Sequence, residues 1–144
     1  MGADLHDIRY VRIGSDDLDE SVRFATDILG LELMERDAGS AYLRGDNRDH
    51  NICYTKGRAD GTVTGWEVPG MAALDAAAAD FEAAEVQVRA GTAEEREKRR
   101  VRGLLVLNDP TGNRIELVAR PAASGRRYFP SRDAGITHFS HVGL

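Results

Sequence analysis

The fold of this chain is decided in residues 8–30, IRYVRIGSDDLDESVRFATDILG. The alternating residues 8–13 predict a strand. Asp17, followed three residues later by Glu20, has the pattern of a capping box and predicts a helix that ends at Gly30. Three short strands separated by glycine-containing turns are expected next, near 31–36, 40–45 and 51–56. The stretch therefore opens a β-α-β-β-β unit.

The same order recurs in the second half of the chain, which predicts an α+β fold of two βαβββ modules, about 5–57 and 62–120. The elements expected there are a strand over 63–68, an alanine-rich helix over 71–84, a strand from 86, and a hairpin of 102–107 with 113–118. Residues 92–100 are almost wholly charged. Such a run is typical of a solvated surface or a mobile loop.

The repeat pattern ends after Ala119. We expect a compact domain over 1–120 and a linker over 121–135, because the latter has no hydrophobic period. The apolar residues 136–144 resemble the first strand of a further, truncated or missing domain. That strand carries His138 and His141, whose odd spacing places them on opposite faces, so they cannot clamp one metal ion together.

Composition narrows the class of protein. A net charge of -5 argues against nucleic acid and anionic membrane as partners, since both attract an excess of Lys and Arg. No stretch reaches the ~20 apolar residues of a membrane span. The N-terminus shows no secretory signal pattern, and the lone Cys53 suits a reducing compartment, where we expect it to be a buried small hydrophobe. The expected location is cytoplasmic, and the expected ligand is small.

Two segments, 17–31 and 108–117, carry a resemblance to the vicinal oxygen chelate superfamily of glyoxalases, bleomycin resistance proteins and dioxygenases. The resemblance implies that the paired modules form a curled mixed sheet around a concavity, with helices on the outer face. Residues 65–68 before the alanine-rich helix, the basic segment 99–105, and His141 followed by Val142 are similar to type I extradiol dioxygenases such as 2,3-dihydroxybiphenyl dioxygenase.

This resemblance implies a non-catalytic N-terminal domain of an enzyme of aromatic compound degradation, an oxidoreductase that cleaves a catechol with Fe(II) and O₂. Mn(II) could replace Fe(II). The implied partners are a missing C-terminal catalytic domain or a second subunit, an aromatic small-molecule substrate, and further copies in a homo-oligomer. His141 would be an iron ligand in the complete enzyme only, with His138 the weaker candidate.

The family's two histidines and one glutamate fall, in this chain, at Tyr10, at or beside Trp66, and at Glu116. A two-His, one-carboxylate iron site needs imidazoles that Tyr and Trp do not supply. The resemblance therefore implies relic positions in the concavity, no catalytic residue, and no metal bound by residues 1–120. We expect Arg12 or Arg114 to neutralise Glu116.

Two histidines and one alternative function remain. His6 and His50 lie in polar, turn-like surroundings, where solvated side chains are expected. The alternative is a standalone binding module of the bleomycin-resistance type, in which Tyr10, Tyr54 and Trp66 would stack on a flat ligand, possible as a swapped dimer. A catalytically inactive scaffold is a third option.

Overall fold

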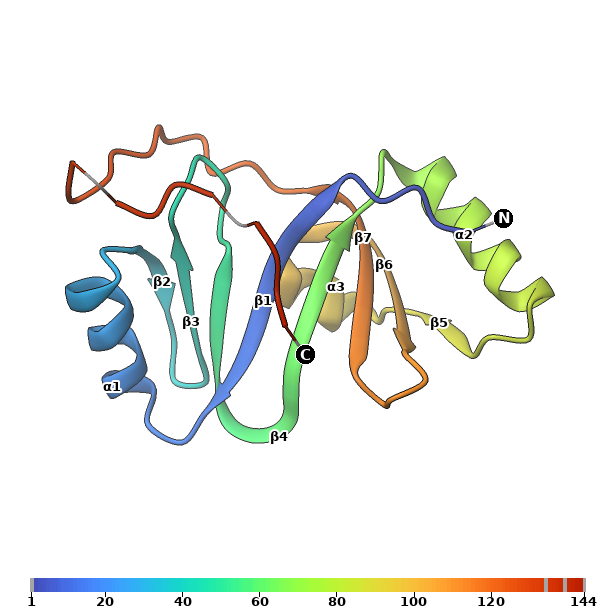
Figure 1. Ribbon diagram of the computed structural model, residues 1–144, viewed down its shortest axis with the longest axis horizontal. Helices are drawn as coiled ribbons and strands as arrows, with labels where there is room; N and C mark the ends of the chain where they lie inside the picture. The colour runs from blue at the N-terminus through green and yellow to red at the C-terminus, as the bar shows by residue number, and fades with distance from the viewer. Residues whose placement is uncertain (1, 134, 139, 144) are drawn as a thin grey trace. The chain divides into compact units, whose positions relative to one another are not determined.

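The structure is a computed structural model that describes residues 2–133, 135–138 and 140–143, with the backbone alone for 58–60. Phe139 and Leu144 of the expected final strand lie outside the described residues. The chain forms an α+β fold (Figure 1). Its elements are β1 Asp7–Ser15, α1 Leu18–Arg23, the π-helix η1 Phe24–Ile28, β2 Glu32–Arg36, β3 Ser40–Arg44, β4 Ile52–Glu67, α2 Met71–Ala83, β5 Val88–Ala90, α3 Ala93–Arg99, β6 Val101–Asn108 and β7 Arg114–Pro121.

The described chain divides into two compact units. The first unit contains residues 10–62 and 123–143, and the second unit contains residues 2–9 and 63–122. Strands β1 and β4 contribute residues to both. Each unit holds one β-α-β-β-β series, which confirms the predicted fold class.

The first unit is built on the predicted helix start. The Asp17 carboxylate accepts a hydrogen bond from the backbone N–H of Glu20 at 2.9 Å, which caps α1. The helix continues as η1 and ends before Gly30, whose φ of +75° only glycine adopts readily. Apolar residues of the helix and of antiparallel strands β2-β3-β4 form one core: Leu18, Val22, Ala25, Leu31, Ala41, Leu43 and Tyr54.

The second unit has the strand order β4-β7-β6-β5. Strand β4 runs parallel to β7, whereas β7 with β6 and β6 with β5 are antiparallel, so the sheet is mixed. Helix α2 covers one face, as the alanine-rich stretch predicts. Its core contains Val68, Leu74, Ala77, Leu105, Leu117 and Ala119.

Two local expectations need correction. The strands expected at 51–56 and 63–68 are the ends of one assigned strand, β4, although Gly57 and Gly61 have positive φ inside it. The charged run 92–100 is neither a loop nor only a solvated surface, because it forms α3. The reason is a capping box: Thr92 accepts from the N–H of Glu95, and the Glu95 carboxylate accepts from the N–H of Thr92.

The residues after β7 return to the first unit. Arg48 and Ala123 form an isolated antiparallel bridge. Among the described residues of the tail, 136–138 and 140–143 are not assigned to a strand. The first strand expected over 136–144 would pair with a further domain, so it stays a prediction.

Candidate functional site

Glu116 is the one relic position with metal-ligand chemistry, and it lies wholly buried in the middle of β7. The Arg99 guanidinium donates from Nε to Oε2 at 2.7 Å and from Nη2 to Oε1 at 2.6 Å. Arg114 adds a third bond, from Nε to Oε1 at 3.1 Å. A buried carboxylate held by two guanidinium groups is neutralised and hydrogen-bonded, which is the condition for keeping its charge in the interior.

Helix α3 delivers Arg99 to this carboxylate. Arg99 is the last residue of α3 and is itself buried. The following residue, Arg100, takes a left-handed conformation with φ of +56°, so the chain turns directly from α3 into β6. The short helix therefore places a cation on the sheet face occupied by Glu116.

A second carboxylate extends the network. Glu95 of α3 binds Arg89 with two contacts of 2.7 Å and binds Arg114 at 3.0 Å. The hydrogen bond from Arg89 is the largest cause that holds the pKa of Glu95 well below its usual range. Arg89, Glu95, Arg114, Glu116 and Arg99 thus form one connected charge network, hereafter the arginine–glutamate network.

The sequence foresaw only part of this network. Arg114 is confirmed as a partner of Glu116, and Arg12 belongs to the first unit. The bidentate partner, Arg99, was missed because its segment was taken for a solvated run. The signal that could have found it is the capping pattern of Thr92 and Glu95, which predicts a helix.

Trp66 and Glu116 do not share a face of the sheet. In the parallel β4–β7 pairing, Gly65 lies opposite Glu116 and Trp66 lies opposite Leu117. Since neighbouring side chains alternate, Trp66 points to the face that α2 covers, where it packs on the core of the second unit. The expectation that Trp66 and Glu116 line one concavity is therefore wrong for Trp66. The residue beside it that faces the Glu116 side is Gly65, which has no side chain to bind a metal.

Tyr10 lies in the first unit, fully buried, with its ring stacked on His50 at 5.5 Å between centroids. Tyr42 meets the same imidazole edge-on at 5.2 Å, and the Asp49 carboxylate lies 2.9 Å from its Nδ1. His50 is only 3% exposed, so the expected solvated histidine is a buried one. The cause is this cover of two rings, which the sequence spacing does not reveal.

The remaining predicted residues are found as follows. His6 is exposed and Cys53 is buried, both as expected. His138 and His141 are exposed, and His141 Nδ1 lies 3.0 Å from Ser140 Oγ. His138 also lines a small apolar cavity of about 100 Å³ in the first unit.

The relic positions do not fit an Fe(II) ion. Both oxygens of Glu116 accept hydrogen bonds from guanidinium groups, which would also repel a cation. Tyr10 is packed against His50, and the place facing Glu116 from β4 is a glycine. Within residues 2–133, 135–138 and 140–143, no three His, Cys, Asp or Glu side chains come together in a way that could hold a metal ion.

Comparison with known proteins identifies the family to which this chain belongs. Residues 7–117 match the Glyoxalase/Bleomycin resistance protein/Dioxygenase superfamily, and the chain belongs to that superfamily. An iron-dependent extradiol dioxygenase of Rhodococcus jostii is 31% identical over 85% of this chain and 42% of its own length. A 1,2-dihydroxynaphthalene dioxygenase of a Pseudomonas species is 31% identical over 92% of this chain and 48% of its own length.

The structural relatives agree with the sequence relatives. A crystal structure of catechol 2,3-dioxygenase superimposes with a TM-score of 0.82 and 27% identity over 90% of this chain and 45% of its own. The chain therefore spans less than half the length of the relatives it matches. Among its described helices, none is long and apolar enough to cross a membrane.

Proposed function

We propose that this chain is the non-catalytic N-terminal domain of an extradiol ring-cleaving dioxygenase. The complete enzyme would act on a catechol of the 2,3-dihydroxybiphenyl type with Fe(II), or Mn(II), and O₂. The similarity to three named dioxygenases, each more than twice as long as the matched part, supports this proposal. The remaining length would supply a catalytic domain, and we propose a cytoplasmic homo-oligomer as the assembled form.

The observation that carries the non-catalytic role is the pairing of Glu116 with Arg99 and Arg114. A carboxylate can bind a metal only through lone pairs that other donors do not occupy. Here three guanidinium hydrogen bonds, two from Arg99 and one from Arg114, already reach the two oxygens of a buried carboxylate. This supports the proposal that the arginine–glutamate network stabilises the sheet and holds no metal.

We assign the first metal ligand of the complete enzyme to His141, in the tail. Its side chain is exposed, so it is accessible to a further domain. His138 is the weaker candidate because its register directs it to the opposite face of an extended chain. Both assignments require a partner domain or a second subunit to supply the other ligands.

The test compares this 144-residue chain with the complete reading frame that contains it, both purified and loaded with Fe(II) under anaerobic conditions. Metal analysis and O₂ uptake with 2,3-dihydroxybiphenyl are measured on each. We expect about one iron per complete protein with ring cleavage, and neither for the shorter chain. Iron near one equivalent with O₂ uptake by the shorter chain would overturn the non-catalytic role. A reading frame that ends at residue 144 would overturn the dioxygenase assignment.

The alternative, a standalone module that binds a flat ligand, is disfavoured by burial. Tyr10 and Tyr54 are 0% and 9% exposed, and Tyr10 already stacks on His50. Trp66 packs on the core of the second unit. The rings expected to stack on a ligand are therefore engaged with the protein. Saturable quenching of Trp66 fluorescence by a planar aromatic compound would restore this alternative.

A further inference from the structure

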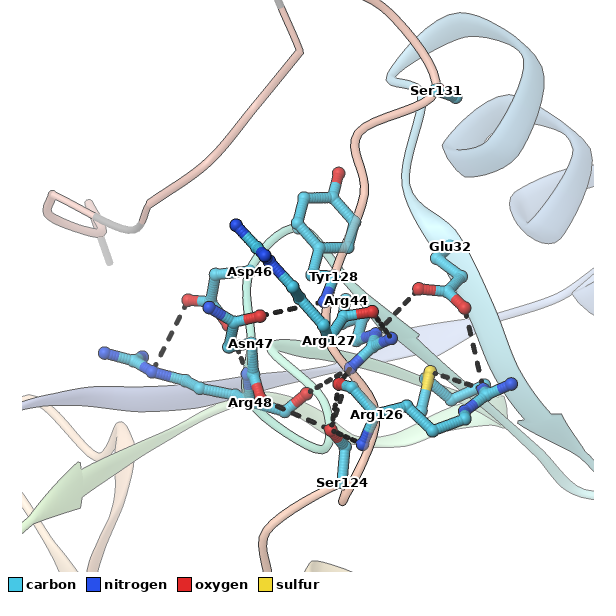
Figure 2. A network of polar contacts seen from close by, with 12 residues as sticks. Glu32, Arg44, Asp46, Asn47, Arg48, Ser124, Arg126, Arg127, Tyr128 and Ser131 are labelled. Atoms are coloured by element: carbon cyan, nitrogen blue, oxygen red, sulfur yellow. Dashed lines mark hydrogen bonds and ion pairs between the residues drawn. The ribbon is translucent and has the colours of Figure 1, made fainter.

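The segment 123–138 is hereafter called the strap. Its described residues, 123–133 and 135–138, have little regular structure yet are bound to the first unit at three places. The first place is Arg44 at the end of β3, whose side chain is 1% exposed. Its Nε donates to Glu32 Oε2 at 2.7 Å. Its Nη1 donates to Ser124 Oγ at 2.9 Å and to the carbonyl oxygen of Arg126 at 3.0 Å (Figure 2).

Further contacts surround this guanidinium. The Arg44 group lies 5.6 Å from the centroid of the Tyr128 ring, within the range of a cation–π contact. The backbone N–H of Tyr128 donates to Asn47 Oδ1 at 2.8 Å, from the loop that follows β3 (Figure 2). Ser124 Oγ also accepts from the N–H of Arg126 at 3.2 Å. The strap is thus folded around Arg44 over five consecutive residues.

The second place is the end of η1. Arg132 donates from Nη1 to the carbonyl oxygen of Ile28 at 2.9 Å and from Nη2 to that of Asp27. Ser131 Oγ donates to the carbonyl oxygen of Gly30 at 3.0 Å. The last carbonyls of a helix have no partner within it, and a cation is favourable at that end. The strap therefore satisfies groups that the helix leaves open.

The third place is apolar. Ile136 joins Leu29, Leu31 and Ile52 around the cavity of about 100 Å³. Ile136 is 45% exposed, so half of its surface is covered without any second chain.

We propose that the strap is a fixed exit path from the domain and that Arg44 is the residue that positions it. A buried guanidinium must keep hydrogen-bond partners, and removal of those partners costs several times the value of an ordinary bond. The strap supplies three acceptors to Arg44: Ser124 Oγ and the carbonyl oxygens of Arg126 and Arg127. If the strap opens, the guanidinium loses these acceptors and keeps those outside the strap, among them the Glu32 carboxylate. The acceptor at Arg126 is a backbone carbonyl, so this contact does not depend on the side chain there.

In the complete enzyme, the strap would fix the position from which the residues that follow it, including His141, approach a further domain. This extension rests on the proposed function. Arg44 touches no substrate or metal, so its role is positioning. Two measurements test the role of the strap separately from the proposed function.

The first measurement is tryptic cleavage after Arg126 and Arg127 in the 144-residue chain. The Arg126 side chain is 62% exposed, whereas the carbonyl of its own peptide bond is held by Arg44. Cleavage requires that the strap opens, so its rate follows the population of the open form. We expect Arg44→Lys and Arg44→Met to raise this rate at least about tenfold, because one ammonium cannot replace a guanidinium fork.

A second variant removes the strap's side of the contact and leaves β3 unchanged. Ser124→Ala combined with Tyr128→Leu should also speed cleavage, while the circular dichroism spectrum stays that of the folded chain. The control is Arg36→Met, which breaks an exposed ion pair with Asp19 on the same unit and should leave the rate unchanged. Cleavage at the wild-type rate in both the folded Arg44 variant and the double variant would overturn the proposal.

The second measurement uses the complete protein. The Ser124→Ala, Tyr128→Leu variant should release iron several-fold faster, while Arg36→Met should not. If trypsin cuts the strap faster in the strap variants, but the complete protein shows no ring cleavage, the proposed function is refuted and the role of the strap is supported. The opposite outcome is also informative. If the complete protein cleaves the catechol ring, but the strap variants show wild-type rates of tryptic cleavage and of iron release, the role of the strap is refuted and the proposed function stands.

Discussion

Arg99 and Glu116 form a buried ion pair in which two guanidinium nitrogens meet two carboxylate oxygens at 2.7 and 2.6 Å. Arg99 ends a seven-residue helix, and Glu116 lies at the centre of a strand seventeen residues later. The pair stands where the related family implies a metal ligand. Its energetics therefore test whether this carboxylate is structural.

Arg99→Leu should lower the free energy of unfolding by about 3 kcal/mol, because it leaves the buried Glu116 carboxylate without its bidentate partner. Denaturant unfolding of the 144-residue chain measures this. Lys98→Met is the matched control: the ion pair of Lys98 with Glu94 is exposed at the surface, and its loss should cost at most about 0.5 kcal/mol.

Arg99→Leu combined with Glu116→Leu should lose less stability than Arg99→Leu alone, since apolar replacement of both partners removes the unpaired charge. The same denaturant series gives the comparison. A single variant as stable as the wild type, or a double variant less stable than the single one, would contradict a structural role for this pair.

Thr92→Ala should cost about 1 kcal/mol, because a seven-residue helix depends strongly on the side chain that caps its first turn. The loss should appear as faster amide hydrogen exchange in α3, and it should extend to the α3 end that carries Arg99. Thr137→Ala, at an exposed position in the tail, is the control. Unchanged exchange in α3 would show that the cap contributes nothing.

Asp109 should titrate far below its ordinary range. The Asn113 amide and the Thr111 hydroxyl donate to its carboxylate at 2.9 and 2.8 Å and hold its pKa at about 2. Because the native pKa lies below the unfolded value of about 3.9, the ionised carboxylate stabilises the fold above that pH. This stabilisation is lost as the pH falls through the native pKa. Carboxyl NMR titration should give a midpoint near pH 2, and Asn113→Ala should raise it. A midpoint near pH 4 in the wild type would show that the hydrogen bonds from Thr111 and Asn113 do not lower the pKa of Asp109.

In the complete protein, His141→Ala should abolish iron retention and ring cleavage without loss of the N-terminal fold. His138→Ala should be milder, since its side chain takes the other face of the extended chain. Iron content, O₂ uptake and the circular dichroism of the two variants decide the point. Iron and turnover kept in the His141 variant would remove this residue from the ligand set.

The sequence predicted the elements because local signals were strong. The capping residue Asp17, the glycine at 30, and the hairpin turn between β6 and β7 each specify a backbone conformation within a few residues. The order of those elements then predicted two βαβββ modules. Helix α3 was the exception, since its high charge outweighed a capping pattern that was present in the sequence.

The site was predictable only in part. The family resemblance implied Tyr10, Trp66 and Glu116 as site positions, but the register between β4 and β7 directs Trp66 and Glu116 to opposite faces. A shift of one residue reverses every side chain of a strand, and a single sequence contains no direct record of which residues pair. Tyr10, which stacks on His50, and Arg99, which binds Glu116, come from other segments of the chain, and the sequence does not show these contacts for the same reason.

By itself, the sequence determined the class of fold and the α+β repeat, because these depend on residue type and local order. Only the tertiary structure decided that Arg99 neutralises Glu116, that Tyr10 and Tyr42 enclose His50, and that Arg44 holds the strap. The Arg99–Glu116 and Arg44–Arg126 contacts join residues 17 and 82 positions apart. Long-range pairing is set by burial and register in the folded chain, which local periodicity does not encode.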